Sequence, residues 1–222
     1  MRARATRPPA TLETDADLRA GIRALRRKCA IARAVHDIAG DPPLRRRPAG
    51  LAGLARIVVG QQVSVASANA IWSRFEAALA PLTPARVLEA GEAELRAVGL
   101  SRPKVRTLKA MARVLAEPGF DLEALPAMSD DDVRTALTKI PGIGPWTADV
   151  YLLFCLGRRD AFAPGDLALQ VAAQHAMRLA ERPRANELAE IAARWRPWRG
   201  VAAHLLWAYY RVVTVRSGGV PV

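Results

Sequence analysis

The residues with the clearest chemical potential lie in the segment LTKIPGIGPWTA, at 137–148. Two glycines and two prolines interrupt a helical pattern there, so a helix, a tight turn and a second helix are expected. Pro145 suits the first position of the second helix, because that position needs no backbone donor. The free N–H groups at such a helix N-terminus bind anions. The expected amide donors to a phosphate are Gly142, Gly144 and Thr147.

A carboxylate follows this hairpin, in the segment AFAPGDLALQ at 161–170. Asp166 comes after a loop that contains proline and glycine, and a helical pattern begins directly after it. A carboxylate can stabilise positive charge that develops on a reacting substrate, and it can orient a water molecule. Asp166 is therefore the candidate catalytic residue. The alternative is a purely structural role, in which its side chain caps the following helix.

The elements that must position these residues are helices. Apolar residues recur at spacings of three and four along most of the chain, and no alternating strand pattern of any length is found. The many alanines and leucines also favour helices. The sequence therefore predicts an all-α protein. The longer helices are expected at about 15–32, 51–59, 65–79, 102–115, 130–139, 145–156, 166–180, 184–195 and 198–215.

The charge balance favours a polyanionic partner. The chain carries 33 Lys and Arg against 21 Asp and Glu, a net charge of +12. Such an excess raises the affinity for nucleic acid first and for an anionic membrane surface second; a compositional preference for arginine is the alternative explanation. Arg45–Arg47, in an expected connector at 36–48, form either a solvated loop or a patch that contacts phosphate. The residues Arg102, Lys104 and Arg106 are either further phosphate contacts or simply exposed.

Other features exclude several classes of protein. Cys29 and Cys155 lack metal-ligand spacing, so this chain alone cannot form a four-cysteine iron–sulfur site. The three histidines show no metal or triad spacing and are expected to be structural or exposed. No apolar run is as long as the stretch of about 18 residues that indicates a membrane-spanning helix. Residues 1–14 lack the apolar core of a secretory signal; they are expected to form a flexible basic tail on a cytoplasmic protein.

The hairpin, the loop and Asp166 together resemble the signature of the helix-hairpin-helix DNA glycosylases. Three further segments, at 56–75, 98–112 and 194–210, are similar to the 3-methyladenine DNA glycosylase II family, and the matches run in the family's order from about residue 50 to 211. The resemblance implies one all-α unit at 15–222, made of two helical lobes with DNA in the cleft between them. The extra N-terminal sheet domain of some relatives is not expected.

The activity that the resemblance implies is base excision repair of alkylated DNA. The enzyme would flip out and hydrolytically excise 3-methyladenine, and also 7-methylguanine or 1,N6-ethenoadenine, leaving an abasic site. Bifunctional relatives carry a lysine two residues after the second hairpin glycine, where this chain has Trp146. Tryptophan cannot form a Schiff base, so no AP-lyase activity is expected. The alternatives are a related glycosylase for hypoxanthine or uracil, and a non-catalytic protein that binds damaged DNA.

The resemblance also implies a base pocket. Trp146 and Trp207 would face the flipped base, because electron-rich rings attract a cationic purine; core packing is the alternative for each. Aromatic pocket residues of relatives correspond here to Val150 and Leu167, which leaves the order of preferred lesions open. Gln62, in the turn GQQVS, would fill the gap left by the flipped nucleotide, unless it is an ordinary surface amide.

The expected partner is double-stranded DNA with alkylated bases, bound by a monomer in the bacterial cytoplasm and associated with the nucleoid through DNA. No membrane and no redox or organic cofactor are expected. In the family the hairpin carbonyls often hold a monovalent cation, Na⁺ or K⁺. By resemblance the carbonyls that would hold it are those of Thr138, Ile140 and Ile143.

Overall fold

The computed structural model describes residues 10–216. Within these residues the chain forms twelve α-helices and one short 3-10 helix, and extended pairing is limited to an isolated bridge between Thr11 and Arg158. The prediction of an all-α protein is confirmed. Two groups of helices, here called the terminal lobe and the central lobe, are distinguished by which helices pack on one another.

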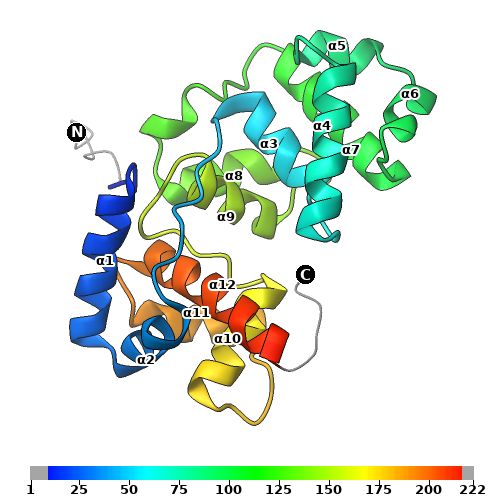
Figure 1. Cartoon of the computed structure of the whole chain (residues 1–222). Coiled ribbons are helices and arrows are strands. Elements are labelled where there is room, and N and C mark those ends of the chain that lie inside the picture. The colour runs from blue at the N-terminus through cyan, green and yellow to red at the C-terminus, as the bar shows by residue number, and fades with distance from the viewer. Residues whose placement is uncertain (1–9, 217–222) are drawn as a thin grey trace, which may run out of the picture.

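The terminal lobe combines the two ends of the described chain, drawn in blue and in yellow to red in Figure 1. Its helices are α1 (Asp15–Lys28), α2 (Ala30–Ala39), α10 (Leu167–Met177), α11 (Ala185–Ala193) and α12 (Arg199–Arg216). Helix α12 packs against α1, α2 and α10, and every residue from 200 to 210 is buried. The apolar stretch near the C-terminus thus forms the core of this lobe.

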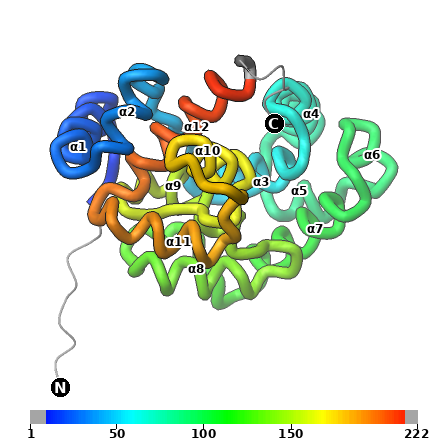
Figure 2. Tube along the Cα trace, turned by 90° about the horizontal axis from the view of Figure 1, so that it is seen from below, coloured from blue at the N-terminus to red at the C-terminus, as the bar shows by residue number. Residues whose placement is uncertain are grey.

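The central lobe contains the hairpin. Its elements are α3 (Gly50–Val59), α4 (Val65–Ala78), α5 (Pro84–Glu89), α6 (Glu92–Ala97), α7 (Arg102–Ala116), the 3-10 helix η1 (Leu125–Ala127), α8 (Asp130–Thr138) and α9 (Pro145–Phe154). Helix α7 packs on α3, α5 and α6, whereas α9 packs on α3 and α8. Only two connections, 40–49 and 155–166, join the lobes (Figures 1 and 2).

Several helices begin where a short polar side chain accepts an N–H group of the first turn. Ser64, Thr83 and Ser129 cap α4, α5 and α8 in this way, as the preference of such residues for the N-cap predicts. Asp166 does the same for α10. The structural role anticipated for Asp166 is therefore present, and its side chain is fixed relative to the helix that it starts.

The first long helix was predicted wrongly. The chain breaks at Cys29, which adopts an extended conformation with φ −138°, and a second helix, α2, runs to Ala39 through part of the expected connector. The apolar period of three and four continues across the break, because α1 and α2 both pack on α12. The apolar periodicity consequently indicates that residues on both sides of Cys29 are buried, but it does not predict that the chain changes direction at Cys29.

The predicted tail at 1–14 is also too long. Leu12 is only 2% exposed, and its N–H donates to the carbonyl of Gly157 at 2.7 Å. The carbonyl of Ala10 accepts the N–H of Arg159 at 3.1 Å. Residues 10–14 therefore belong to the packed structure, because one apolar side chain and two backbone groups find partners there. The rest of the predicted tail, residues 1–9, lies outside the described residues.

Candidate active site and nucleic-acid interface

Asp166 lies where the two lobes meet, and its carboxylate accepts three hydrogen bonds. Oδ2 accepts the indole N–H of Trp146 at 2.9 Å. Oδ1 accepts the indole N–H of Trp207 at 3.0 Å and the backbone N–H of Leu169 at 3.0 Å. Trp146 comes from α9 in the central lobe and Trp207 from α12 in the terminal lobe. The side chain remains partly exposed, so this fixed negative charge can meet a substrate.

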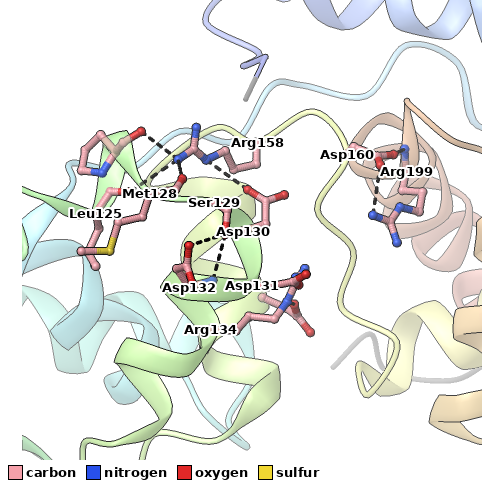
Figure 3. A network of polar contacts seen from close by, with 12 residues as sticks. Leu125, Met128, Ser129, Asp130, Asp131, Asp132, Arg134, Arg158, Asp160 and Arg199 are labelled. Carbon is pink, nitrogen blue, oxygen red and sulfur yellow. Dashed lines mark hydrogen bonds and ion pairs between the residues drawn. The ribbon is translucent and has the colours of Figure 1, made fainter. Parts of the chain in front are cut away.

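The loop that leads to Asp166 is anchored on the central lobe through Arg158. This arginine is 2% exposed, and its Nη2 donates to the carbonyls of Pro126 at 2.8 Å and Met128 at 3.0 Å (Figure 3). Its Nε lies 3.3 Å from a carboxylate oxygen of Asp130. Burial raises the pKa of Asp130, and the charge of Arg158 opposes that shift. The start of the loop is thereby held against η1 and α8.

The same loop is anchored on the terminal lobe through Asp160. Its carboxylate accepts the backbone N–H of Arg199 at 3.1 Å and the Nη2 group of the same residue at 3.0 Å (Figure 3). Farther along, Gln170 donates its side-chain amide to the carbonyl of Pro164 at 3.0 Å. The position of Asp166 therefore depends on contacts from both lobes.

Trp207 is enclosed, with 7% of its surface exposed. The centroid of its ring system lies 5.2 Å from that of Phe154 and 6.1 Å from that of His204. The guanidinium carbon of Arg45 lies 5.7 Å from the Trp207 ring centroid. Trp207 therefore packs in the core in this structure, as the alternative considered from the sequence states. Its hydrogen bond to Asp166 was not predicted from the sequence. Contact of Trp146 or Trp207 with a flipped base stays a prediction.

His204 is structural and neutral. Its Nδ1–H donates to the carbonyl of Gly200 at 2.8 Å, and its Nε2 accepts the backbone N–H of Arg45 at 3.4 Å. Burial is the main cause that lowers the pKa of His204 to about 4. The solvated alternative for Arg45–Arg47 is wrong for two of the three residues, because Arg45 lies over Trp207 and Arg47 lies over Phe154. The run of arginines is visible in the sequence, but the sequence does not predict which aromatic rings these arginines contact.

The hairpin forms as predicted, between Thr138 at the end of α8 and Pro145 at the start of α9. Gly142 has φ +88°, and a Cβ atom there would lie 2.1 Å from Oγ1 of Thr107 on α7. Gly144 is the N-cap of α9 and makes no side-chain cap. A Cβ atom on Gly144 would meet nothing within 4 Å. The first glycine is needed for packing and the second leaves the helix N-terminus open.

Thr147 lies inside the structure. It is 2% exposed, and its hydroxyl accepts the side-chain amide of Gln61 at 2.9 Å. This bond ties the turn after α3 to the first turn of α9. The side chain of Thr147 therefore supports the turn. The predicted contact between its backbone amide and DNA stays a prediction.

Gln62 is exposed in the same turn, with φ +54°. A residue other than glycine in this left-handed region is strained by about 1 kcal/mol or more, and such residues cluster at functional sites. Lys104 donates its ammonium group to the carbonyl of Val59 at 2.7 Å. Lys104 thus caps the C-terminal end of α3, just before the turn. A phosphate contact or plain exposure was considered for this side chain from the sequence, and the structure shows this capping contact.

The candidate cation ligands are backbone carbonyls of the hairpin. Ile140 and Ile143 anchor their side chains in the core, and the carbonyl of Ile140 already accepts the N–H of Ile143 at 3.0 Å. Carbonyl oxygens are ligands that hard cations accept, so this donor set fits such an ion in chemical type. Among residues 10–216, no group of three or more His, Cys, Asp or Glu residues could hold a metal ion.

A cavity of about 470 Å³ lies apart from Asp166. Its lining includes Asp130, Asp149, Asp160 and Arg199, but neither Asp166 nor the two tryptophans that contact it. Arg134 donates to Asp149 in this cavity at 2.7 Å, and burial raises the pKa of Asp149. The charged side chains there pair with one another, so we assign these residues a structural role.

The chain is similar in sequence to known DNA repair proteins. A family described as HhH-GPD superfamily base excision DNA repair protein matches residues 55–197. A putative DNA-3-methyladenine glycosylase of Bacillus subtilis is 29% identical over 69% of this chain and 56% of its own length. DNA-3-methyladenine glycosylase 1 of Schizosaccharomyces pombe is 30% identical over 69% of each protein. The chain thus spans between about half and two thirds of the length of these relatives.

Solved structures give the same picture. A 3-methyladenine DNA glycosylase of Schizosaccharomyces pombe in complex with abasic DNA has a TM-score of 0.75 and 25% identity, covering 85% of this chain and 95% of that one. A DNA-3-methyladenine glycosidase of Bacillus halodurans has a TM-score of 0.72 and 26% identity, covering 95% of each chain. Among the described helices, none is both long and apolar enough to cross a membrane.

Proposed function

This chain belongs to the HhH-GPD superfamily of base excision DNA repair proteins, and we propose that it is a DNA glycosylase that removes alkylated purines. The observation that carries this proposal is the carboxylate of Asp166, held by one indole donor from each lobe. The names of its relatives point to 3-methyladenine as the expected product.

The hairpin and the turn at Gln62 would bind and open the duplex. The N–H groups at the start of α9, near Gly142 and Gly144, can donate to the oxygens of a DNA phosphate. A damaged base is reached only after it leaves the stack, and the exposed side chain of Gln62 would fill the gap. Because phosphate contacts release counterions, binding should weaken steeply as the salt concentration rises.

Asp166 would act on the sugar of the flipped nucleotide. Breaking the glycosidic bond develops positive charge at the anomeric carbon, and a carboxylate that is already in place stabilises that charge. A methylated purine that is cationic leaves without strong acid assistance, and Asp166 can also orient the attacking water. Trp146 offers no amine for a Schiff base, so we propose that the DNA strand stays intact at the abasic site.

The hairpin would also hold a cation. We propose that the carbonyls of Thr138, Ile140 and Ile143 hold a sodium or potassium ion. Such an ion would supply positive charge beside a bound phosphate. The protein is further proposed to act as a monomer, since one chain contributes all the residues assigned here.

The decisive experiment measures base release from a methylated duplex by the wild type and by Asp166→Asn. Asparagine keeps an oxygen that can cap α10, so the variant should fold and bind DNA. Loss of the charge should slow release of 3-methyladenine by about 10²–10³-fold. No release from any alkylated duplex by the wild type would favour a non-catalytic binding protein. Release of only hypoxanthine or uracil would favour the other base preference, and a borohydride-trapped DNA adduct would contradict the absence of lyase activity.

A further inference from the structure

Arg45 combines a partly buried charge with a position over the ring of Trp207. Within residues 10–216 its guanidinium makes no hydrogen bond and no ion pair, and its one described contact is with the ring of Trp207, at 5.7 Å. Its neighbour Arg46 differs, since that side chain pairs with Glu13 at 3.0 Å. A guanidinium carries five N–H donors and stays charged at neutral pH, so Arg45 has donors available for a ligand.

The backbone holds Arg45 firmly in this place. The N–H of Arg45 donates to His204 at 3.4 Å, and the N–H of Leu44 donates to Asp15 at 3.2 Å. On the other side, the N–H of Arg47 donates to the carbonyl of Phe154 at 2.9 Å. The segment that crosses between the lobes is therefore anchored on each side of Arg45, and the guanidinium lies over the ring of Trp207.

This charge lies beside the reaction centre. The indole under Arg45 donates to Asp166 at 3.0 Å, so one ring joins the guanidinium to the carboxylate. Burial and the charges of Arg211 and Arg47 lower the pKa of Arg45, whereas the charge of Asp166 raises it. If the anomeric carbon of a purine nucleotide rests against Asp166, its base would lie near Trp146 and Trp207, and hence near Arg45.

We infer that Arg45 is a specificity-determining residue, which disfavours cationic bases and favours neutral purines that offer acceptor atoms. This inference rests on the proposed glycosylase function. A fixed positive charge repels a 7-methylguanine or 3-methyladenine base, which is cationic while attached to DNA. The same guanidinium can donate to purine O6 and N7 atoms. Arg45 thus offsets the attraction that Asp166 and the two indoles exert on a cationic base.

The test compares single-turnover release of 7-methylguanine with that of hypoxanthine and 1,N6-ethenoadenine from matched duplexes. Arg45→Met keeps an apolar side chain on the Trp207 ring and removes the charge. This variant should raise the ratio of cationic to neutral base release by about tenfold, as the interaction of two charges roughly 6 Å apart in a partly screened site suggests. Arg45→Lys, which keeps the charge, should retain a ratio close to that of the wild type.

Arg47→Met is the matched control. Arg47 is also a partly buried arginine over an aromatic ring, 5.3 Å from the centroid of Phe154, but that ring makes no hydrogen bond to Asp166. Its ratio should equal that of the wild type, and thermal melting of each variant checks the fold.

Each outcome separates the inference from the proposed function. An unchanged ratio in Arg45→Met, or an equal change in Arg47→Met, would overturn the inference and leave the glycosylase function intact. Release of only cationic bases by the wild type would also overturn the inference and leave the glycosylase function intact. Release of 3-methyladenine but of none of these three bases would overturn the inference alone, and failure to release 3-methyladenine as well would overturn both.

Discussion

The two hairpin glycines form a matched pair that tests the proposed DNA contact. Gly142→Ala forces a side chain onto a residue with φ +88°, which costs about 1–2 kcal/mol. The new Cβ would also lie 2.1 Å from Oγ1 and 2.9 Å from Cβ of Thr107, and overpacking of this kind costs about 1–3 kcal/mol. The free energy of unfolding should therefore fall by about 2–5 kcal/mol.

Gly144→Ala should leave the fold almost unchanged. Its φ of −96° is allowed for alanine, and the added Cβ meets nothing within 4 Å. Alanine is a poorer N-cap than glycine but lowers the entropy of the unfolded chain, so the net change in unfolding free energy should stay within about 1 kcal/mol. The methyl group would stand at the open end of α9. If a phosphate binds there, the affinity for DNA should fall by about tenfold, as expected for losing one charge-assisted hydrogen bond.

Denaturant unfolding and fluorescence anisotropy with a lesion-free duplex at fixed salt would measure both quantities. Gly142→Ala with wild-type stability would refute the close contact between the hairpin and α7. Gly144→Ala with wild-type affinity for DNA would refute the phosphate site at the N-terminus of α9. Loss of folding in Gly144→Ala would contradict the open space around that residue.

Two further predictions concern the centre of the molecule. Trp207→Phe keeps an aromatic ring but removes the N–H donor to Asp166, so single-turnover base release should slow by about tenfold, the value of one hydrogen bond to a charged group; an unchanged rate would contradict a positioning role. His204 stays neutral in the folded state down to a pKa of about 4, whereas the unfolded chain binds this proton near pH 6.5. Folding stability should therefore fall by up to about 3 kcal/mol as the pH drops from about 6.5 to 4. Denaturant unfolding across this range should show a smaller decrease for His204→Gln, and equal decreases would count against the buried histidine.

Features that depend on neighbours a few residues away can be predicted from the sequence of this protein. Helical periodicity, the prolines and glycines of the hairpin, and polar N-caps act within one or two turns of helix. They are sufficient to predict the all-α class, the turn between α8 and α9, and the place of Asp166 at the start of α10. The resemblance to a family then supplied the base excision role, which residue chemistry alone left as binding of a polyanion.

Contacts between side chains that are distant in the sequence depend instead on the tertiary structure. Trp146 on α9 and Trp207 on α12 belong to different lobes, and both contact Asp166, which follows a loop anchored on the two lobes through Arg158 and Asp160. Sequence spacing could assign both tryptophans only to a pocket or to a core. Arg45 is a similar case, since its ring contact depends on how the connector between the lobes packs on α12. Contacts of this kind follow from the packing of whole helices, and no local pattern encodes them.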